Sequence, residues 1–117
     1  MTEFPKEEYY GNVEYKVILN NMNSNKISKY ATQLKFRLNE GEGIAFYYIG
    51  VTDNGEIKGI EDQYIDQQID YMKSILSEIN ASIKNKEIVP IKNIKNSKLI
   101  ILEIQANYSL DSIFLTN

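Results

Sequence analysis

The side chains best suited to chemistry in this sequence are four carboxylates, Glu7, Glu8, Glu14 and Asp53. Carboxylate oxygens bind the hard cations Mg²⁺ and Mn²⁺, and such ions support hydrolysis of phosphodiester bonds. A metal-dependent site made of Glu8, Glu14 and Asp53 is therefore one hypothesis. The plainer interpretation places Glu8 in an acidic amino-terminal segment, Glu14 on a solvent-facing strand position and Asp53 in a turn, where Asp is common.

A second group of candidate residues is a run of lysines in the carboxyl-terminal half. Residues 84–98 carry five lysines and one glutamate, a net charge of +4, whereas residues 53–78 carry seven acidic and two basic residues, a net charge of −5. Lysines neutralise nucleic-acid phosphates, but they also protect edge strands from pairing with other chains. If RNA is bound, the residues we expect to contact it are Lys84, Lys86, Lys92, Lys95 and Lys98.

The composition excludes several kinds of site. The 117 residues include no cysteine and no histidine, which removes disulfides, thiolate metal sites and Ser-His-Asp triads. There is no GxxxxGK[ST] phosphate loop, and Gly41 and Gly43 instead indicate the end of a helix followed by a strand. We therefore expect a chain that is not an enzyme and that carries no cofactor and no metal.

Length and charge indicate a single domain. The chain is 43% hydrophobic and 25% charged, which is usual for globular proteins, and its net charge of −3 is not that of a general nucleic-acid binder. No apolar stretch is long enough to span a membrane, and the acidic amino terminus is unlike a signal peptide. We expect a cytoplasmic protein with a flexible arm over residues 1–11 and one α+β domain over residues 12–117.

Hydrophobic periodicity predicts two helices. Apolar residues recur at helical spacing from Ile27 to Leu38, between a capping Asn23 or Ser24 and a terminating Gly41. A second helix is predicted to start near Asp62. Its apolar stripe repeats at steps of three and four residues through Ile65, Ile69, Met72, Leu76 and Ile79.

Apolar alternation predicts five strands, over residues 13–19, 44–51, 56–60, 83–94 and 99–106. Residues 44–51 are apolar on both faces, which is typical of a central strand, and Asp53-Asn54-Gly55 predicts a tight hairpin to the next strand. Pro90 predicts an edge or bulged strand, and residues 95–97 a turn. The order β-α-β-β-α-β-β predicts an α+β fold, a mixed sheet of about five strands with two helices on one face.

Three segments form a recognisable combination: GNVEYK at residues 11–16, ATQLKFRLNEG at 31–41, and YIGVTDNG at 48–55. In this order and spacing they resemble the region before the GTPase domain in the GTP-binding protein 1 family, which are elongation-factor-Tu-like translational GTPases. The resemblance implies a non-catalytic accessory domain whose parent protein is the GTPase. Its implied partners are RNA, the ribosome or the downstream GTPase domains of the parent chain.

A more distant resemblance concerns the carboxylates. Glu14-Tyr15-Lys16, the glycines after the first predicted helix, Ile49-Gly50-Val51 and Asp53 are similar to the pattern of Schlafen-type AlbA-2 domains. Some Schlafen proteins cut RNA with three carboxylates. Two of those positions fall on Glu14 and Asp53, and the third falls on Tyr9, next to Glu8. The alternative that this implies is a Schlafen-like, metal-dependent RNA-processing domain.

A third alternative is a protein-interaction module without chemistry. The carboxyl-terminal segment Ile113-Phe114-Leu115 is apolar, and together with an exposed apolar patch it could pack against another domain or protein. The sequence leaves this alternative open beside the other two.

Overall fold

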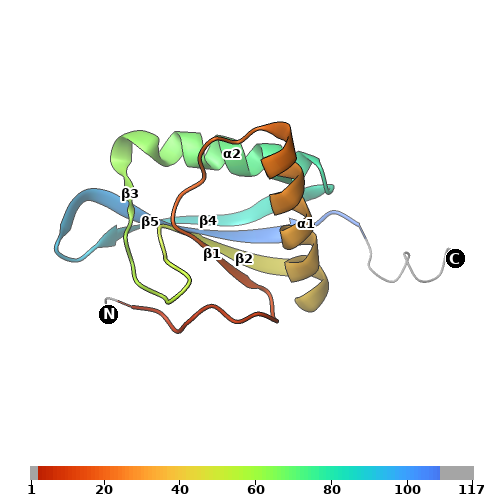
Figure 1. Cartoon of the computed structure of the whole chain (residues 1–117), viewed down its shortest axis with the longest axis horizontal. Helices are drawn as coiled ribbons and strands as arrows, with labels where there is room; N and C mark the ends of the chain where they lie inside the picture. Colours follow the sequence, from red (N-terminus) through yellow and green to blue (C-terminus); the bar gives the residue numbers. More distant parts are fainter. Residues whose placement is uncertain (1–2, 109–117) are drawn as a thin grey trace, which may run out of the picture.

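Two amphipathic helices and the apolar faces of the strands meet in one two-layer arrangement (Figure 1). The structure is a computed structural model that describes residues 3–108, so the segment Ile113-Phe114-Leu115 lies outside the described residues. Two helices cover one face of a mixed five-stranded sheet, which confirms the predicted α+β fold and its order of elements. The elements are β1 (Val13–Lys16), α1 (Ser24–Glu40), β2 (Ile44–Ile49), β3 (Ile60–Glu61), the 3₁₀ turn η1 (Asp62–Tyr64), α2 (Ile65–Ser77), β4 (Ala81–Ile91) and β5 (Ile94–Ala106).

β5 is the strand around which the sheet is arranged. It pairs antiparallel with β2, β3 and β4, and β2 pairs in parallel with β1 on its other side. β4 follows β5 over its whole length, from Ile94 to Ala106. The short strand β3 therefore lies on the same side of β5 as β2, beyond the end of β2, where it pairs with Ser97 and Lys98.

The main core lies between the sheet and the helices. Alternate residues of β2 and β5 point to this layer, so Tyr47 and Leu102 are fully buried against Leu34 of α1 and Met72 of α2. α1 starts where the Asn23 side chain accepts a hydrogen bond from the backbone N–H of Lys26 at 2.9 Å, and it ends at Gly41. Both helix boundaries are as the sequence predicted.

The predicted hairpin after β2 is wrong in its second half. Residues 56–59 pair back only with residues 50–52, through the bridge of Val51 with Ile57 and the N–H of Lys58, which donates to the Gly50 carbonyl at 2.7 Å. They do not return along β2, and the chain departs as β3. The reason is that β1 and β5 already occupy both sides of β2. Gly50 and Gly59, both at positive φ, turn the chain away, and the Gly50 carbonyl accepts the N–H of Gly59 at 2.9 Å.

The β4–β5 hairpin turns earlier than predicted. The turn is at Lys92-Asn93, where Asn93 adopts φ +70°, because Ile91 already pairs with Ile94; residues 95–97 lie within β5, although Asn96 also has a positive φ of 58°. β5 therefore begins at Ile94. The prediction of an edge strand at Pro90 is confirmed, since β4 pairs only with β5 among the described strands and has a register shift beside this proline.

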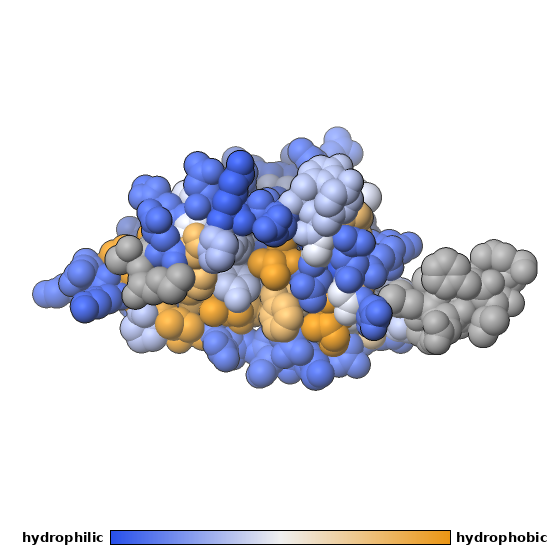
Figure 2. Space-filling view, turned by 90° about the horizontal axis from the view of Figure 1, so that it is seen from below, coloured by the Kyte–Doolittle hydropathy of each residue, from blue (hydrophilic) through white to orange (hydrophobic). Residues whose placement is uncertain are grey.

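Neither α1 nor α2 covers the second face of the sheet (Figure 1). Phe4 and Tyr15 pack here with Tyr48, with the rings of Phe4 and Tyr48 edge to face at 5.2 Å between centroids. Figure 2 shows this face from below, with apolar side chains gathered between hydrophilic borders. None of the helices formed within residues 3–108 is long and apolar enough to cross a membrane.

The amino-terminal segment lies against this second face. The backbone N–H of Phe4 donates to Gly55 at 2.8 Å, and that of Glu7 donates to Asp53 at 2.8 Å. The sequence predicted a flexible arm over residues 1–11. The contacts show where residues 3–11 attach, and the mobility of the arm stays a prediction.

Candidate functional site

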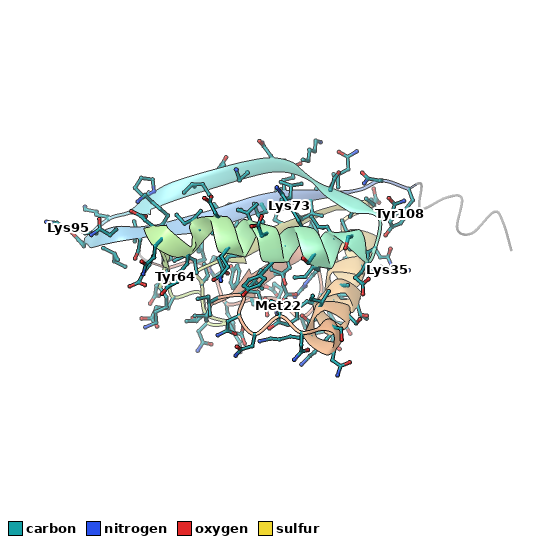
Figure 3. All side chains as sticks on the ribbon, turned by 90° about the horizontal axis from the view of Figure 1, so that it is seen from above. Met22, Lys35, Tyr64, Lys73, Lys95 and Tyr108 are labelled. Atoms are coloured by element: carbon teal, nitrogen blue, oxygen red, sulfur yellow. The ribbon has the colours of Figure 1, made fainter. Side chains whose placement is uncertain are left out.

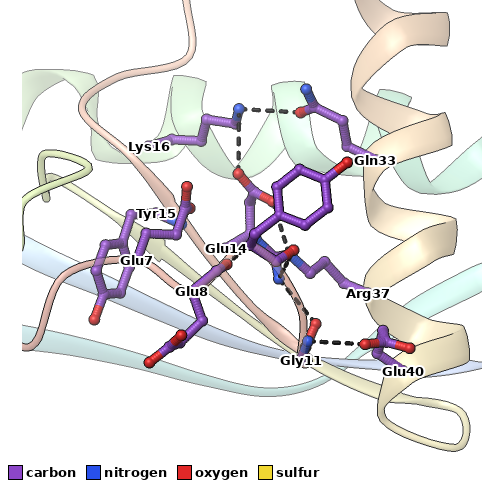
Figure 4. Close-up of polar contacts among 10 residues, drawn as sticks. Glu7, Glu8, Gly11, Glu14, Tyr15, Lys16, Gln33, Arg37 and Glu40 are labelled. Atoms are coloured by element: carbon purple, nitrogen blue, oxygen red, sulfur yellow. Dashed lines mark hydrogen bonds and ion pairs between the residues drawn. The ribbon is translucent and has the colours of Figure 1, made fainter.

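The site is organised around the buried carboxylate of Glu14. In the parallel pair of β1 and β2, Glu14 lies opposite the fully buried Tyr47, so its side chain points toward the helices. Only 7% of Glu14 is exposed. Its carboxylate accepts the Nε–H of Arg37 at 2.9 Å and lies 3.5 Å from the Nζ of Lys16 (Figure 4). The plain interpretation of Glu14 as a solvent-facing strand residue is therefore wrong.

Arg37 connects the helix layer to the amino-terminal segment. It is 4% exposed, on the apolar side of α1, and every nitrogen of its guanidinium donates a hydrogen bond. The Nε–H donates to Glu14, the Nη1 to the carbonyls of Tyr9 and Gly11, and the Nη2 to the carbonyl of Glu8 at 2.9 Å. One side chain thus fixes the path of residues 8–11 across the end of β1.

Glu7 covers the exposed edge of β1. Its Oε2 accepts the backbone N–H of Tyr15 at 2.6 Å, and the Tyr15 hydroxyl donates to the Pro5 carbonyl at 2.9 Å. Burial raises the pKa of Glu7 to about 7; the Tyr15 N–H opposes this, and the neighbouring carboxylates of Glu14 and Asp53 add to it. Below pH 7, Glu7 is therefore mostly protonated, beside the Glu14 carboxylate that contacts Arg37 and Lys16.

These residues form one wall of an open pocket of about 590 Å³. α1 forms another wall, and the turn after β2 contributes Asp53. The three carboxylates of the metal hypothesis, Glu8, Glu14 and Asp53, all line it. The described residues that line it are Lys6, Glu7, Glu8, Tyr9, Glu14, Thr32, Gln33, Phe36, Arg37 and Asp53.

Sharing a pocket does not make these carboxylates a metal centre. Within residues 3–108, no three acidic side chains are placed so that they could hold one ion. Glu14 already has two cationic partners, while Glu8 and Asp53 are exposed. The arrangement suits binding of a ligand at the pocket mouth better than it suits metal-assisted hydrolysis, which needs several oxygens converging on one ion.

The five candidate RNA-binding lysines do not form a single patch. Lys84 lies 3.7 Å from Glu103, and Lys98 is paired with Asp62 at 2.7 Å. Lys86 is opposite Leu102 and so lies on the helix side of the edge strand. Lys92 and Lys95 are exposed at or next to the hairpin turn and have no ion pair with any described residue. Figure 3 shows Lys95 at one end of the molecule.

Two residues organise the site, Arg37 and Glu7. The sequence analysis selected Glu7 as one of four carboxylates without identifying its contact with β1, and it did not select Arg37. The spacing of Arg37 carried a signal, since it follows Leu34 by three residues and is therefore on the buried stripe. The contact of Glu7 could not be recognised from neighbouring residues. Its partner, the backbone N–H of Tyr15, is free to bond because β1 is an edge strand, and the sequence does not show which strands lie at an edge.

Replacing Glu7 by Gln should remove a pH dependence of folding. The pKa of Glu7 is higher in the folded state, about 7, than its usual value of 4.5, so the folded protein binds the extra proton between these values. The stabilisation is therefore full below pH 4.5 and is lost as the pH rises through 7. Because Glu7 is partly exposed, we expect the free energy of unfolding of the native protein to fall by only about 1 kcal/mol as the pH rises through this range. For Glu7→Gln we expect no such fall.

Urea denaturation at several pH values between 5 and 8 measures this difference. Gln at position 7 retains an oxygen that can accept the Tyr15 N–H and an N–H that can donate to Glu14. Glu8→Gln, at an exposed neighbouring carboxylate, is the matched control and should follow the native pH profile. Parallel pH profiles for the native protein and Glu7→Gln would contradict the role assigned to Glu7.

Comparison with known proteins finds two kinds of relative. Over 112 residues, 95% of the chain, it is 36% identical to an uncharacterized protein of Acanthamoeba polyphaga mimivirus, of which it covers 59%. Over 79 residues, 68% of the chain, it is 35% identical to GTP-binding protein 2 of Mus musculus and of Homo sapiens, and it covers 13% of each. No family model matches the chain. The chain is thus similar to a small part of a GTP-binding protein and to more than half of a viral protein.

Proposed function

We propose that the chain is a non-catalytic accessory domain of an elongation-factor-like translational GTPase, working by contact with RNA or the ribosome or with the GTPase domains of its parent protein. The observation that carries this proposal is the 35% identity to a segment that makes up only 13% of GTP-binding protein 2. A segment of that size is one domain of a larger protein. Most of GTP-binding protein 2 lies outside the segment that matches this chain.

The local structure of the glycines supports a role apart from nucleotide binding. A phosphate loop connects a strand to the start of a helix, where free backbone N–H groups face the anion. Here Gly41 lies at the end of α1, and Gly43 leads into β2, so the order of elements is reversed. Their N–H groups donate to carbonyls at the end of α1, those of Arg37 and Leu38.

The likeness to the mimivirus protein supports an independent domain. The segment matched in the mimivirus protein covers 95% of this chain and so includes every strand of the sheet, whereas the match to GTP-binding protein 2 covers 68%. A domain that recurs in proteins of different size folds around its own core. The core between the helices and β2 and β5 provides this.

If RNA is the partner, Lys92 and Lys95 should account for much of the binding. Both are exposed on the β4–β5 hairpin, and the other three candidates are paired or lie along the edge strand. Fluorescence anisotropy with transfer RNA and a ribosomal RNA fragment, at low and moderate salt, measures the affinity. We expect Lys92→Glu with Lys95→Glu to reduce the slope of log K against log salt by about 2.

Lys29→Glu with Lys73→Glu is the matched control, because it makes the same change in net charge at exposed positions of α1 and α2. Equal effects of both double variants would indicate a general charge effect and contradict a hairpin contact. Absence of RNA binding at low salt would favour docking onto GTPase domains. Cleavage of the RNA in the presence of Mn²⁺, abolished by Asp53→Asn, would contradict a non-catalytic role and support the Schlafen-like alternative.

A further inference from the structure

Three exposed aromatic side chains gather at the mouth of the pocket. Tyr9 is 79% exposed, Tyr10 68% and Phe36 39%. The ring centroids of Tyr9 and Tyr10 are 4.9 Å apart, and each lies 6.5 Å from that of Phe36. Scattered exposed aromatics are ordinary, but three in mutual contact beside a cavity form a continuous binding surface. Tyr9 and Phe36 are also part of the pocket lining.

The charges around this surface favour a cation. Glu8 and Asp53 are exposed carboxylates of the pocket lining, and neither has an ion pair with a described residue. Arg37 cannot attract an anion, because Glu14 balances its charge and each guanidinium nitrogen already donates to the protein. Among the described residues of the lining, Lys6 is the one other cation, so the available carboxylates there outnumber the available cations.

We propose that the pocket binds a lysine or arginine side chain presented by a basic segment of another protein. Aromatic faces attract cations through their quadrupoles, and neighbouring carboxylates add charge-assisted hydrogen bonds. The pocket, about 590 Å³, is large enough for a whole side chain of this length. Nucleic acid fits this surface poorly, because its phosphates would meet Glu8 and Asp53.

This site is separate from the lysines considered for RNA. Figure 3 shows Lys95 at one end of the molecule, and Lys35, on the helix that forms the pocket wall, toward the other. The two surfaces therefore present opposite chemistry at different places. Binding of a basic peptide at the pocket and binding of RNA at the hairpin lysines are therefore independent, and the outcome of one measurement does not predict the outcome of the other.

Titration of the full chain into a fluorescein-labelled oligo-arginine peptide, with an oligo-glutamate peptide of equal length as the opposite probe, tests the proposal. We expect binding of the basic peptide only. Tyr9→Ala with Asp53→Asn should weaken it by about tenfold or more, since a cation–aromatic contact and a carboxylate contact are both lost. Tyr9→Phe retains the ring and should keep the affinity of the native protein.

Tyr64→Ala with Asp70→Asn is the matched control, because it removes the same groups from exposed positions of η1 and α2. The control should bind the peptide as the native protein does. Equal loss in both double variants would mean attraction to the acidic chain as a whole and would overturn the proposal. The proposal would also be overturned if the Tyr9 and Asp53 substitutions left the affinity for the peptide unchanged. It would be overturned as well if a single-stranded RNA bound through Tyr9 with an affinity that Asp53→Asn did not change. If circular dichroism shows that the double variant is unfolded, Glu8→Gln gives the test instead, because the Glu8 side chain is exposed and has no ion pair with a described residue. Unchanged peptide affinity in Glu8→Gln would also overturn the proposal.

Discussion

Arg37→Met should lower the free energy of unfolding by about 3–5 kcal/mol, because it leaves a buried charge without its main partner. Glu14 is 7% exposed and loses the Nε–H bond of 2.9 Å. The carbonyls of Glu8, Tyr9 and Gly11 lose their donors at the same time. Lys16, at 3.5 Å from Glu14, compensates only in part. Equilibrium urea denaturation at pH 7 measures the loss.

Two further variants separate the causes of this effect. Lys35→Met is the control, since it removes a cation from an exposed position of the same helix and should change stability by less than about 0.5 kcal/mol. Glu14→Met added to Arg37→Met removes the unpaired charge, and we expect it to restore part of the lost stability. A cost below about 1 kcal/mol for Arg37→Met alone would show that the pair is not structurally important.

Gly50→Ala should cost about 3–4 kcal/mol, through backbone strain and a backbone collision together. Gly50 has φ +105°, and a Cβ there would lie 3.0 Å from the Cα of Gly59 and 3.2 Å from its N and C. The neighbour cannot rotate away as a side chain can, because it is backbone whose N–H donates to the Gly50 carbonyl. Thermal unfolding followed by circular dichroism gives the change in stability.

Gly43→Ala provides the matched control for this prediction. Gly43 has φ +97°, but nothing lies within 4 Å of its added Cβ. Its replacement should therefore cost only the strain, about 1–2 kcal/mol. Equal costs at both positions would mean that the close approach of Gly59 to Gly50 contributes nothing.

The elements that local pattern defines could be predicted from the sequence. The stripe through Met72 and Leu76 needs only helical periodicity, and Asn23 and Gly41 set the ends of α1 by their own chemistry. Pro90 fixed the edge position of β4 because it has no N–H to give to a second neighbour. Each of these depends on residues close together in the chain.

Features that depend on distant pairing could not be predicted. The hairpin after β2 failed because β5, some fifty residues further on, takes the side of β2 that the return strand needed. Glu14 was expected at a solvent-facing strand position, because nothing within β1 shows that this side chain points inward. That orientation depends on Arg37, which reaches β1 only in the folded structure.

The candidate site was predicted in part. The resemblance that joined Glu14 to Asp53, with Glu8 nearby, selected residues that line one pocket. Charge counting along the chain grouped five lysines that the fold disperses, because residues adjacent in a strand point to opposite faces and Asp62 and Glu103 reach two of them. The exposed ring cluster of Tyr9, Tyr10 and Phe36 joins residues some 26 positions apart and has no sequence signature.

The central position of β5 also sets when the protein can become folded during synthesis. Chains emerge from the ribosome amino terminus first, and β5 is the last strand of the described part and the shared partner of β2, β3 and β4. Until β5 has emerged as far as Leu102, Tyr47 has no partner residue on the β5 side, and the helices have only part of a sheet to cover. Folding on the ribosome therefore waits for almost the whole domain, and the nascent chain depends on protection of its apolar surface until then.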